Sequence, residues 1–432
     1  MHIAPLVSFR IIFGAMMLIS TLRFILKGWV EELYVKPKFF FTYLGFDWIQ
    51  PLDEQGMYMV FLVMLISSTG ILLGAWYRIS SVLFFLCFTY VELIDKTNYL
   101  NHYYFVSLVA FLMIWLPAHR YASIDVLRNP KIYAEKVQAG FINVLRFQLG
   151  LVYFFAGVAK INPDWLVRSQ PLSLWLSASV EKPVIGFLFR YKLTAVLLSW
   201  FGMIYDLTIP FLLSFRRTRS TAYLAVIVFH LLTWYLFPIG MFPFIMIGST
   251  LLFFSEKWHK KFISPIERLF HITSKKDHKP IIRLNPSIGY LFIIFAFFQL
   301  VLPFRYLLYP GDLFWTEQGY RFSWRVMLME KAGYVTFKVT DPEKNKKTLV
   351  YPYQYLTPQQ EKMMATQPDM ILQFAHFLEK EFREKGINDP MITADAYVTI
   401  NGRPGKRFID PSVDLTRLPR NWHHKRWVLS HE

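Results

Sequence analysis

The stretch 140–160 reads GFINVLRFQLGLVYFFAGVAK, an apolar run that ends abruptly in Lys160. About 20 apolar residues are enough for a helix to cross the hydrocarbon core of a bilayer. A charged side chain beside hydrocarbon is costly, so an ionisable residue at this boundary is a candidate functional group. The stretch therefore predicts a membrane span and a lysine with a chemical role.

Similar apolar runs recur along most of the chain and set the predicted fold class. The 432 residues are 54% hydrophobic and 18% aromatic, and the apolar residues come in long blocks. We predict a mainly α protein, with a polytopic transmembrane helical bundle of about nine spans over residues 1–309. A smaller soluble α+β domain is predicted over residues 310–432. The expected spans are 7–26, 57–75, 79–94, 103–117, 140–159, 194–214, 220–237, 240–254 and 288–308.

The soluble domain begins where the apolar blocks give way to Glu- and Lys-rich sequence with scattered prolines. Alternating apolar residues and turn residues predict two hairpins with a helix between them. The elements are strands 333–341 and 347–353 around the turn 341–345, a helix over 358–385 between the N-cap Thr357 and Gly386, and strands 393–400 and 406–410 around Asn401-Gly402.

The positive charge of the chain, +17, is distributed mainly around the expected spans. This pattern is typical of membrane topology rather than of nucleic-acid binding, so we expect the lipid bilayer and no nucleic acid as a partner. With the N-terminus in the cytoplasm, inner loops carry 16 Lys and Arg residues and outer loops carry 9. We therefore expect a cytoplasmic N-terminus and an extracytoplasmic C-terminal domain. The single cysteine, Cys87, excludes an intrachain disulfide.

Two ionisable groups are expected at the outer face. Lys160 ends one span, and His102 opens another after Asp95-Lys96. Lost hydration disfavours the charged form of an amine, and a neutral amine can accept a proton. Histidine can orient a hydroxylated ring or shuttle a proton. The alternatives are a snorkelling lysine, a histidine that caps its helix, and a solvated Asp95-Lys96 pair.

Further candidates lie in or after the later spans. Phe229-His230 lies within one span, and an intramembrane histidine suits either a pocket or an interhelical hydrogen bond. Asp206 must be paired or protonated, and Arg146 or Lys192 is the expected partner. Three aromatic residues after the last span either cover the site or form an interfacial belt: Trp315, Tyr320 and Trp324. No hydrolase, nucleotide-binding or zinc motif is found, and we expect no metal.

In their order along the chain, these segments resemble vitamin K-dependent gamma-carboxylase. The segments are Asp95 through His102, Tyr153 through Lys160, Phe229-His230 with Phe237 through Phe242, Trp315 through Trp324, and Val398 through Pro411. The resemblance implies that Lys160 and His102 are catalytic, and that both also bind the cofactor together with Asn101, His230, Met241, Phe242 and Tyr320. It further implies that Trp315 and Trp324 bind the substrate.

The resemblance also implies a reaction and its participants. In that family a lysine deprotonates reduced vitamin K, which reacts with dioxygen and leaves as the epoxide. The strong base formed on the way removes a γ-proton from glutamate, and the carbanion captures carbon dioxide. The implied cofactor is a menaquinol or phylloquinol type of isoprenoid naphthohydroquinone, with O2 and CO2 as co-substrates. The implied partner is a Glu-containing peptide or protein, and the implied location is a bacterial inner membrane.

Two other functions stay open from the residues alone. One is a quinol epoxidase that carboxylates no protein, and the other is a non-enzymatic membrane transporter or lipid-binding protein. Transporters commonly show repeat symmetry between their halves, which this sequence lacks. Ala159 stands where vertebrate carboxylases have a second lysine, and Gly319 and Thr233 also depart from their pattern. These departures bear on the protein substrate more than on the quinol chemistry.

Overall fold

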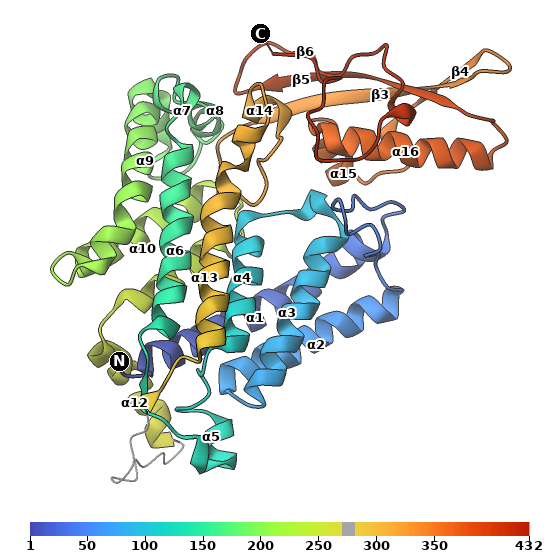
Figure 1. Cartoon of the computed structure of the whole chain (residues 1–432). Coiled ribbons are helices and arrows are strands. Elements are labelled where there is room, and N and C mark those ends of the chain that lie inside the picture. The colour runs from blue at the N-terminus through green and yellow to red at the C-terminus, as the bar shows by residue number, and fades with distance from the viewer. Residues whose placement is uncertain (270–280, 432) are drawn as a thin grey trace.

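The computed structural model describes residues 1–269 and 281–431. A unit of helices makes up the N-terminal part, and a smaller α+β unit lies across one end of it (Figure 1). The main helices of the first unit are α1 (Ala4–Leu26), α2 (Glu54–Leu73), α3 (Tyr77–Ile94), α4 (Asn101–Trp115), α5 (Ile124–Arg128), α6 (Gly140–Ala159), α7 (Pro163–Leu166), α8 (Leu172–Ser177), α9 (Lys192–Ser214), α10 (Arg219–Leu236), α11 (Phe242–Thr250), α12 (Glu256–Leu269) and α13 (Pro286–Val301). Two short strands, β1 (Lys136–Val137) and β2 (Ile281–Ile282), pair in parallel within the same unit.

Six helices in the described part of the chain are long and apolar enough to cross a membrane, which indicates an integral membrane protein. They are α1, α2, α3, α6, α9 and the segment Pro286–Leu308, in which α13 continues into a 3-10 helix. The expected count of about nine spans is therefore too high.

The three remaining expected spans fail for local reasons. The span 103–117 is the 15-residue helix α4, and the span 240–254 is the short α11 with one 3-10 turn. Pro243 at the start of α11 cannot continue a helix from the preceding segment, so the chain breaks there. The span 220–237 is α10, whose Arg219 and His230 interrupt its apolar sequence.

Close packing of α6 on α9 decides where the ionisable groups meet. Gly157 of α6 faces α9, where a Cβ atom would lie only 2.8 Å from the backbone nitrogen of Leu207. Small residues at such crossings let two membrane helices approach closely. The absence of a side chain at Gly157 therefore brings the end of α6 against the middle of α9.

The second unit contains one antiparallel sheet and two helices. The sheet has the order β4-β3-β5-β6, and the helices are α15 and α16. The bounds are α14 (Leu313–Thr316), which precedes the sheet, β3 (Lys331–Asp341), β4 (Lys346–Val350), α15 (Pro358–Met364), α16 (Pro368–Glu384), β5 (Met391–Ile400) and β6 (Lys406–Arg407). The fold class of a helical membrane bundle with a smaller α+β part is thus confirmed.

Several local predictions in this unit are confirmed, and others are wrong in whole or part. The strands expected over 347–353 and 406–410 end early, at Val350 and Arg407, and Pro352 begins a 3-10 turn after the first of them. Thr357 forms a capping box with Gln360, and Gly386 takes the left-handed conformation after α16. The turn at Asn401-Gly402 also has positive φ at both residues, as a tight hairpin requires. The single helix expected over 358–385 is instead two helices. Pro368 lacks an N–H donor and holds Gln367 in an extended conformation, which ends α15 and restarts the chain as α16.

The helices α15 and α16 lie between the sheet and the helical unit (Figure 1). Alternate residues of β3 and β5 point inward and pack on the apolar face of α16. The opposite side of α16 contacts the helical unit, where Lys96 donates from Nζ to Oε1 of Gln373 at 3.1 Å. Gln360 of α15 donates to Oδ2 of Asp95 at 2.8 Å. The two units therefore share a polar interface at this end of the helices.

Candidate functional site

A buried ion pair joins the end of α6 to the middle of α9. Nζ of Lys160 donates to Oδ2 of Asp206 at 2.7 Å and to the carbonyl of Ala156 at 3.3 Å. The two side chains are only 7% and 6% exposed. A buried charge without a partner is strongly destabilising, so each residue depends on the other for its place in the fold.

The predicted partners of Asp206 were wrong. Arg146 donates instead to the carbonyl of Leu252, and Lys192 is an exposed residue at the start of α9. Both ends of the actual pair were visible in the sequence, as an acid inside one apolar run and a lysine at the end of another.

The turn after α6 fixes the lysine backbone. Asn162 donates from Nδ2 to the carbonyl of Ala159 and accepts from the N–H of Trp165, both at 2.9 Å. The indole of Trp165 donates to the carbonyl of Ser199 on α9, and its ring lies 5.3 Å from Nζ of Lys160. The tryptophan therefore holds α9 and the lysine together, and favours a cation at this position.

A cavity of about 120 Å³ opens beside the pair. Its walls are mainly apolar and aromatic, with polar groups from Tyr153, Lys160, Asp206, His230 and Thr233. The aromatic wall residues are Trp165, Trp175, Phe201, Phe229, Phe237 and Phe242. A mainly apolar pocket with a few converging polar groups is the usual form of a small-molecule site.

His230 is fully buried at the wall of this cavity. Its Nε2 lies 2.9 Å from the hydroxyl of Tyr153, and its Nδ1 has no hydrogen-bond partner in the described part of the chain. Buried polar atoms are rarely left without a partner in native proteins. The free ring nitrogen is therefore available to a ligand.

His102 lies close to this site but does not line the cavity. The ring of Phe242 lies 5.6 Å from that of His102 and 5.5 Å from that of His230. Phe242, a predicted site residue, thus contacts both histidines and forms part of the wall. Met241 packs on the core of the helical unit instead. Asn101 donates to the carbonyl of Arg325 at 2.9 Å and also lies outside the wall.

The three aromatic residues after the last span lie elsewhere. Trp315 is buried in the core of the C-terminal unit, where its indole donates to the carbonyl of Leu429. Trp324 stacks on Tyr104 with ring centroids 4.8 Å apart, and Tyr320 lies near Phe314. None of the three lines the cavity.

The segment that carries these aromatics nevertheless reaches the cavity through Val326 and Met327. Phe322, Trp324 and Met327 all have positive φ, a conformation that is costly for residues with side chains. Such strain persists only where surrounding contacts enforce it, and the hydrogen bond from Asn101 to Arg325 is one of those contacts. Asn101 therefore helps to shape the cavity although it does not line it.

The structure thus gathers Lys160, His230 and Phe242 of the predicted site residues at one cavity. It does not bring Asn101, His102, Met241, Trp315, Tyr320 or Trp324 into that wall. Sequence reasoning missed Trp175 and the pairing of Lys160 with Asp206. No group of three or more His, Cys, Asp or Glu side chains suited to a metal occurs in residues 1–269 and 281–431.

Comparison with known families gives two matches that together cover most of the chain. The family model of the HTTM domain matches residues 1–258. The family model described as the lumenal domain of vitamin K-dependent gamma-carboxylase matches residues 284–432. No solved structure matches the chain.

Proposed function

Because the chain belongs to the vitamin K-dependent gamma-carboxylase family, we propose that it oxidises a reduced naphthoquinone to the epoxide and couples this to glutamate carboxylation. Its family makes it an integral membrane enzyme of the gamma-carboxylase kind, and its C-terminal region is extracytoplasmic. The further proposal is a cytoplasmic N-terminus in a bacterial inner membrane. The buried pair Lys160–Asp206 at the wall of an apolar cavity is the observation that carries the proposed chemistry.

The cavity residues fit a hydroxylated aromatic ring. Aromatic and aliphatic side chains form most of the wall, and Lys160 and the free Nδ1 of His230 supply polar contacts. Phe201, on the wall, is half-exposed on the outside of α9, where the bilayer would contact the helix. This arrangement supports entry of an apolar isoprenoid chain from the membrane.

The ion pair changes the expected role of the lysine. The sequence suggested a lone neutral amine, but Lys160 has a carboxylate at hydrogen-bond distance. Two strongly interacting groups take up and release protons as one unit. Lys160 can accept a proton from a ligand hydroxyl while it passes one to Oδ2 of Asp206. The pair as a whole then acts as the general base, with Lys160 as the group that contacts the ligand.

The walls of the cavity serve the same chemistry by excluding water. When bound, the hydroquinone and dioxygen together supply the strong base that removes the γ-proton of glutamate, after which carbon dioxide adds to the carbon. Apolar wall residues such as Phe229 and Phe237 keep water from competing for that base. The hydroxyl of Tyr153 lies 2.9 Å from Nε2 of His230 and fixes the ring, which leaves Nδ1 as the ring nitrogen without a partner in the described part of the chain.

The direct test measures both half-reactions on the full chain in lipid nanodiscs. Reduced vitamin K, oxygen, radiolabelled bicarbonate and a Glu-containing peptide are supplied, and epoxide and labelled peptide are quantified separately. We expect both products from the wild type and neither from Lys160→Ala. Epoxide without labelled peptide would establish a quinol epoxidase that lacks carboxylation. Neither product from folded wild type would overturn the proposal.

A cavity-filling variant tests the location while it leaves both charges of the pair in place. Gly202 lines the cavity, and a Cβ atom there meets only Trp165 and Lys160 at ordinary contact distances of 3.8 and 4.0 Å. Gly202→Leu extends into the cavity and is expected to abolish epoxide formation, while Gly202→Ala is expected to retain most of it. Equal turnover by both variants would place the reaction elsewhere.

A further inference from the structure

A second cavity, of about 300 Å³, lies between the helical unit and the C-terminal unit. Its wall combines the segment after α3, the segment after α13, the start of α16 and the chain from Leu418 to Trp427. Six of the lining side chains are lysine or arginine, and a single one is a carboxylate, Asp369. The six basic residues are Lys96, Arg305, Arg321, Arg420, Lys425 and Arg426.

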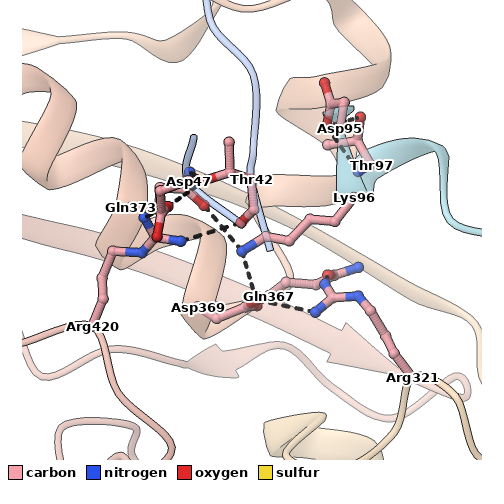
Figure 2. A network of polar contacts seen from close by, with 10 residues as sticks. All are labelled: Thr42, Asp47, Asp95, Lys96, Thr97, Arg321, Gln367, Asp369, Gln373 and Arg420. Atoms are coloured by element: carbon pink, nitrogen blue, oxygen red, sulfur yellow. Dashed lines mark hydrogen bonds and ion pairs between the residues drawn. The ribbon is translucent and has the colours of Figure 1, made fainter. Parts of the chain in front are cut away.

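The single carboxylate already has two partners. Asp369 accepts from Nζ of Lys96 at 2.8 Å and from Arg321 at 3.0 Å, as Figure 2 shows. Lys96 is only 4% exposed, so the alternative of a solvated Asp95-Lys96 pair was wrong. Burial alone would raise the pKa of Asp369, but the charges of Arg321 and Lys96 outweigh burial and hold its pKa well below the usual range.

Of the four other basic groups, Arg420 pairs with Asp47 at 2.6 Å. Arg305, Lys425 and Arg426 have no carboxylate partner in the described part of the chain. Burial lowers the pKa of Lys425; the charge of Asp369 opposes this effect, and the charge of Arg321 adds to it. The cavity therefore holds three basic side chains that form no ion pair with a carboxylate in the described part of the chain.

We propose that this basic cavity binds carboxylate side chains of an acidic polypeptide segment. Its basic groups are spread around a space larger than one small anion requires, and several carboxylates along one chain would satisfy them. The adjacent Trp422 is largely exposed and, with Leu418 and Pro419, offers apolar contacts to the same segment. The inference rests on the proposed function and gives the Glu-containing substrate a docking site.

One strained segment connects this docking site to the apolar cavity. Arg321 and Phe322 line the basic cavity, while Val326 and Met327 line the cavity beside Lys160. A polypeptide held in the first cavity therefore lies against the same stretch of chain that forms the second. This juxtaposition allows a docked segment to present successive glutamates toward the reaction site.

Binding is tested on the full chain in nanodiscs of neutral phosphatidylcholine, without quinol or oxygen. A fluorescent peptide with several glutamates is compared with the same peptide carrying glutamines, and Kd is measured by anisotropy. The Glu peptide is expected to bind about 10-fold or more tightly than the Gln peptide, and added salt is expected to weaken it. Since no turnover is needed, this result is separate from success or failure of the proposed reaction.

Variants of the basic lining residues test whether the peptide binds in this cavity. Arg305→Gln with Lys425→Gln is expected to weaken Glu-peptide binding by about 10- to 100-fold. Lys425→Gln alone decides the matter if the double variant does not fold. In the described part of the chain Lys425 donates a hydrogen bond from its backbone N–H, to Oε1 of Gln318, and none from its side chain. Lys257→Gln, an exposed residue of α12 at the other end of the helical unit, is the matched control.

Three outcomes would overturn the docking site. The first is equal affinity for the Glu and Gln peptides, and the second is unchanged affinity in Lys425→Gln. The third is failure of the Glu peptide to bind while inorganic phosphate, or anionic lipid added to the nanodiscs, does bind. In that outcome the binding of phosphate or anionic lipid depends on Lys425. That result would assign the cavity to a phosphate group instead.

Discussion

Asn401, at the β5–β6 turn, donates from Nδ2 to Oδ2 of Asp164 at 2.9 Å. Asp164 lies only four residues after Lys160 in the chain. Arg403 of the same turn pairs with Oδ1 of Asp164 at 2.5 Å, and Arg168 pairs with it at 2.9 Å. The C-terminal unit thus holds the segment that carries the candidate base. The contact between the two units therefore helps to position the site.

The Asp164 contact predicts how stability depends on pH. Burial raises the pKa of Asp164, but the hydrogen bond from Asn401 and the charge of Arg403 outweigh it and lower the pKa overall. A carboxyl whose pKa is lower in the folded state stabilises the fold above its unfolded pKa. This contribution is lost as the pH falls through the folded pKa.

Asp164→Asn is accordingly expected to lower the free energy of unfolding by about 1–3 kcal/mol near neutral pH, and by less in acid. Thermal unfolding from neutral to acidic pH measures the difference. The control is Asp395→Asn, which removes an exposed pair with Arg407 and is expected to change little. Identical curves for the two variants would show that Asp164 does not join the units.

The close approach at Gly157 predicts a long-range effect on the ion pair. Gly157→Ala places a methyl group against the backbone of Leu207 and must push α9 away from α6. We expect lower stability, by about 1–3 kcal/mol, together with reduced epoxide formation. Gly150→Ala, on the same helix, meets Pro210 at an ordinary 3.7 Å and is expected to be neutral. Wild-type turnover in Gly157→Ala would show that epoxide formation does not depend on the close contact of α6 with α9.

The basic cavity predicts a pH dependence of peptide docking. Burial lowers the pKa of Lys96 to about 8, partly offset by Asp369 and reinforced by Arg321 and Arg420. Lys96 is charged below that value and neutral above it, so Glu-peptide affinity should fall as the pH rises through about 8. Lys425 lines the same cavity, and burial lowers its pKa as well.

The variant Lys96→Arg isolates this group, because arginine stays charged across the whole interval. Its affinity for the Glu peptide, measured by anisotropy between neutral and mildly alkaline pH, should stay level. A decline as steep as that of the wild type would assign the titration to another group.

The predicted orientation is testable because Cys87 is the single cysteine of the chain. In a Cys87→Ser background, a cysteine at Glu343 in the β3–β4 turn should react with an impermeant thiol reagent from outside intact cells. A cysteine at Lys257 in α12 should react only after permeabilisation. Both positions are exposed, so access alone separates them. The reverse pattern would place the N-terminus outside.

Local signals in the sequence predicted local structure well. The apolar run 140–160, the cap at Thr357 and the turn at Asn401-Gly402 each form through near neighbours in the chain. The break at Pro368 is equally local, because proline lacks an N–H donor and restricts the residue before it.

Contacts between distant segments could not be predicted in the same way. The partner of Asp206 depends on which helix packs against α9, and that follows from the close approach at Gly157. Trp315 looked like a residue at the membrane boundary, yet Phe408 of the C-terminal unit covers it. His102 was expected to touch the bound ring, whereas Phe242 occupies the adjoining part of the wall.

The central claim, that Lys160 and Asp206 act as one base, is tested most directly by epoxide formation in Lys160→Met/Asp206→Asn. Removing only Lys160 strands a buried carboxylate and should cost about 3–5 kcal/mol of stability. The double variant replaces both charges and should regain most of that stability. The account predicts a well-folded double variant that forms no epoxide from reduced vitamin K, and wild-type turnover in that variant would contradict it.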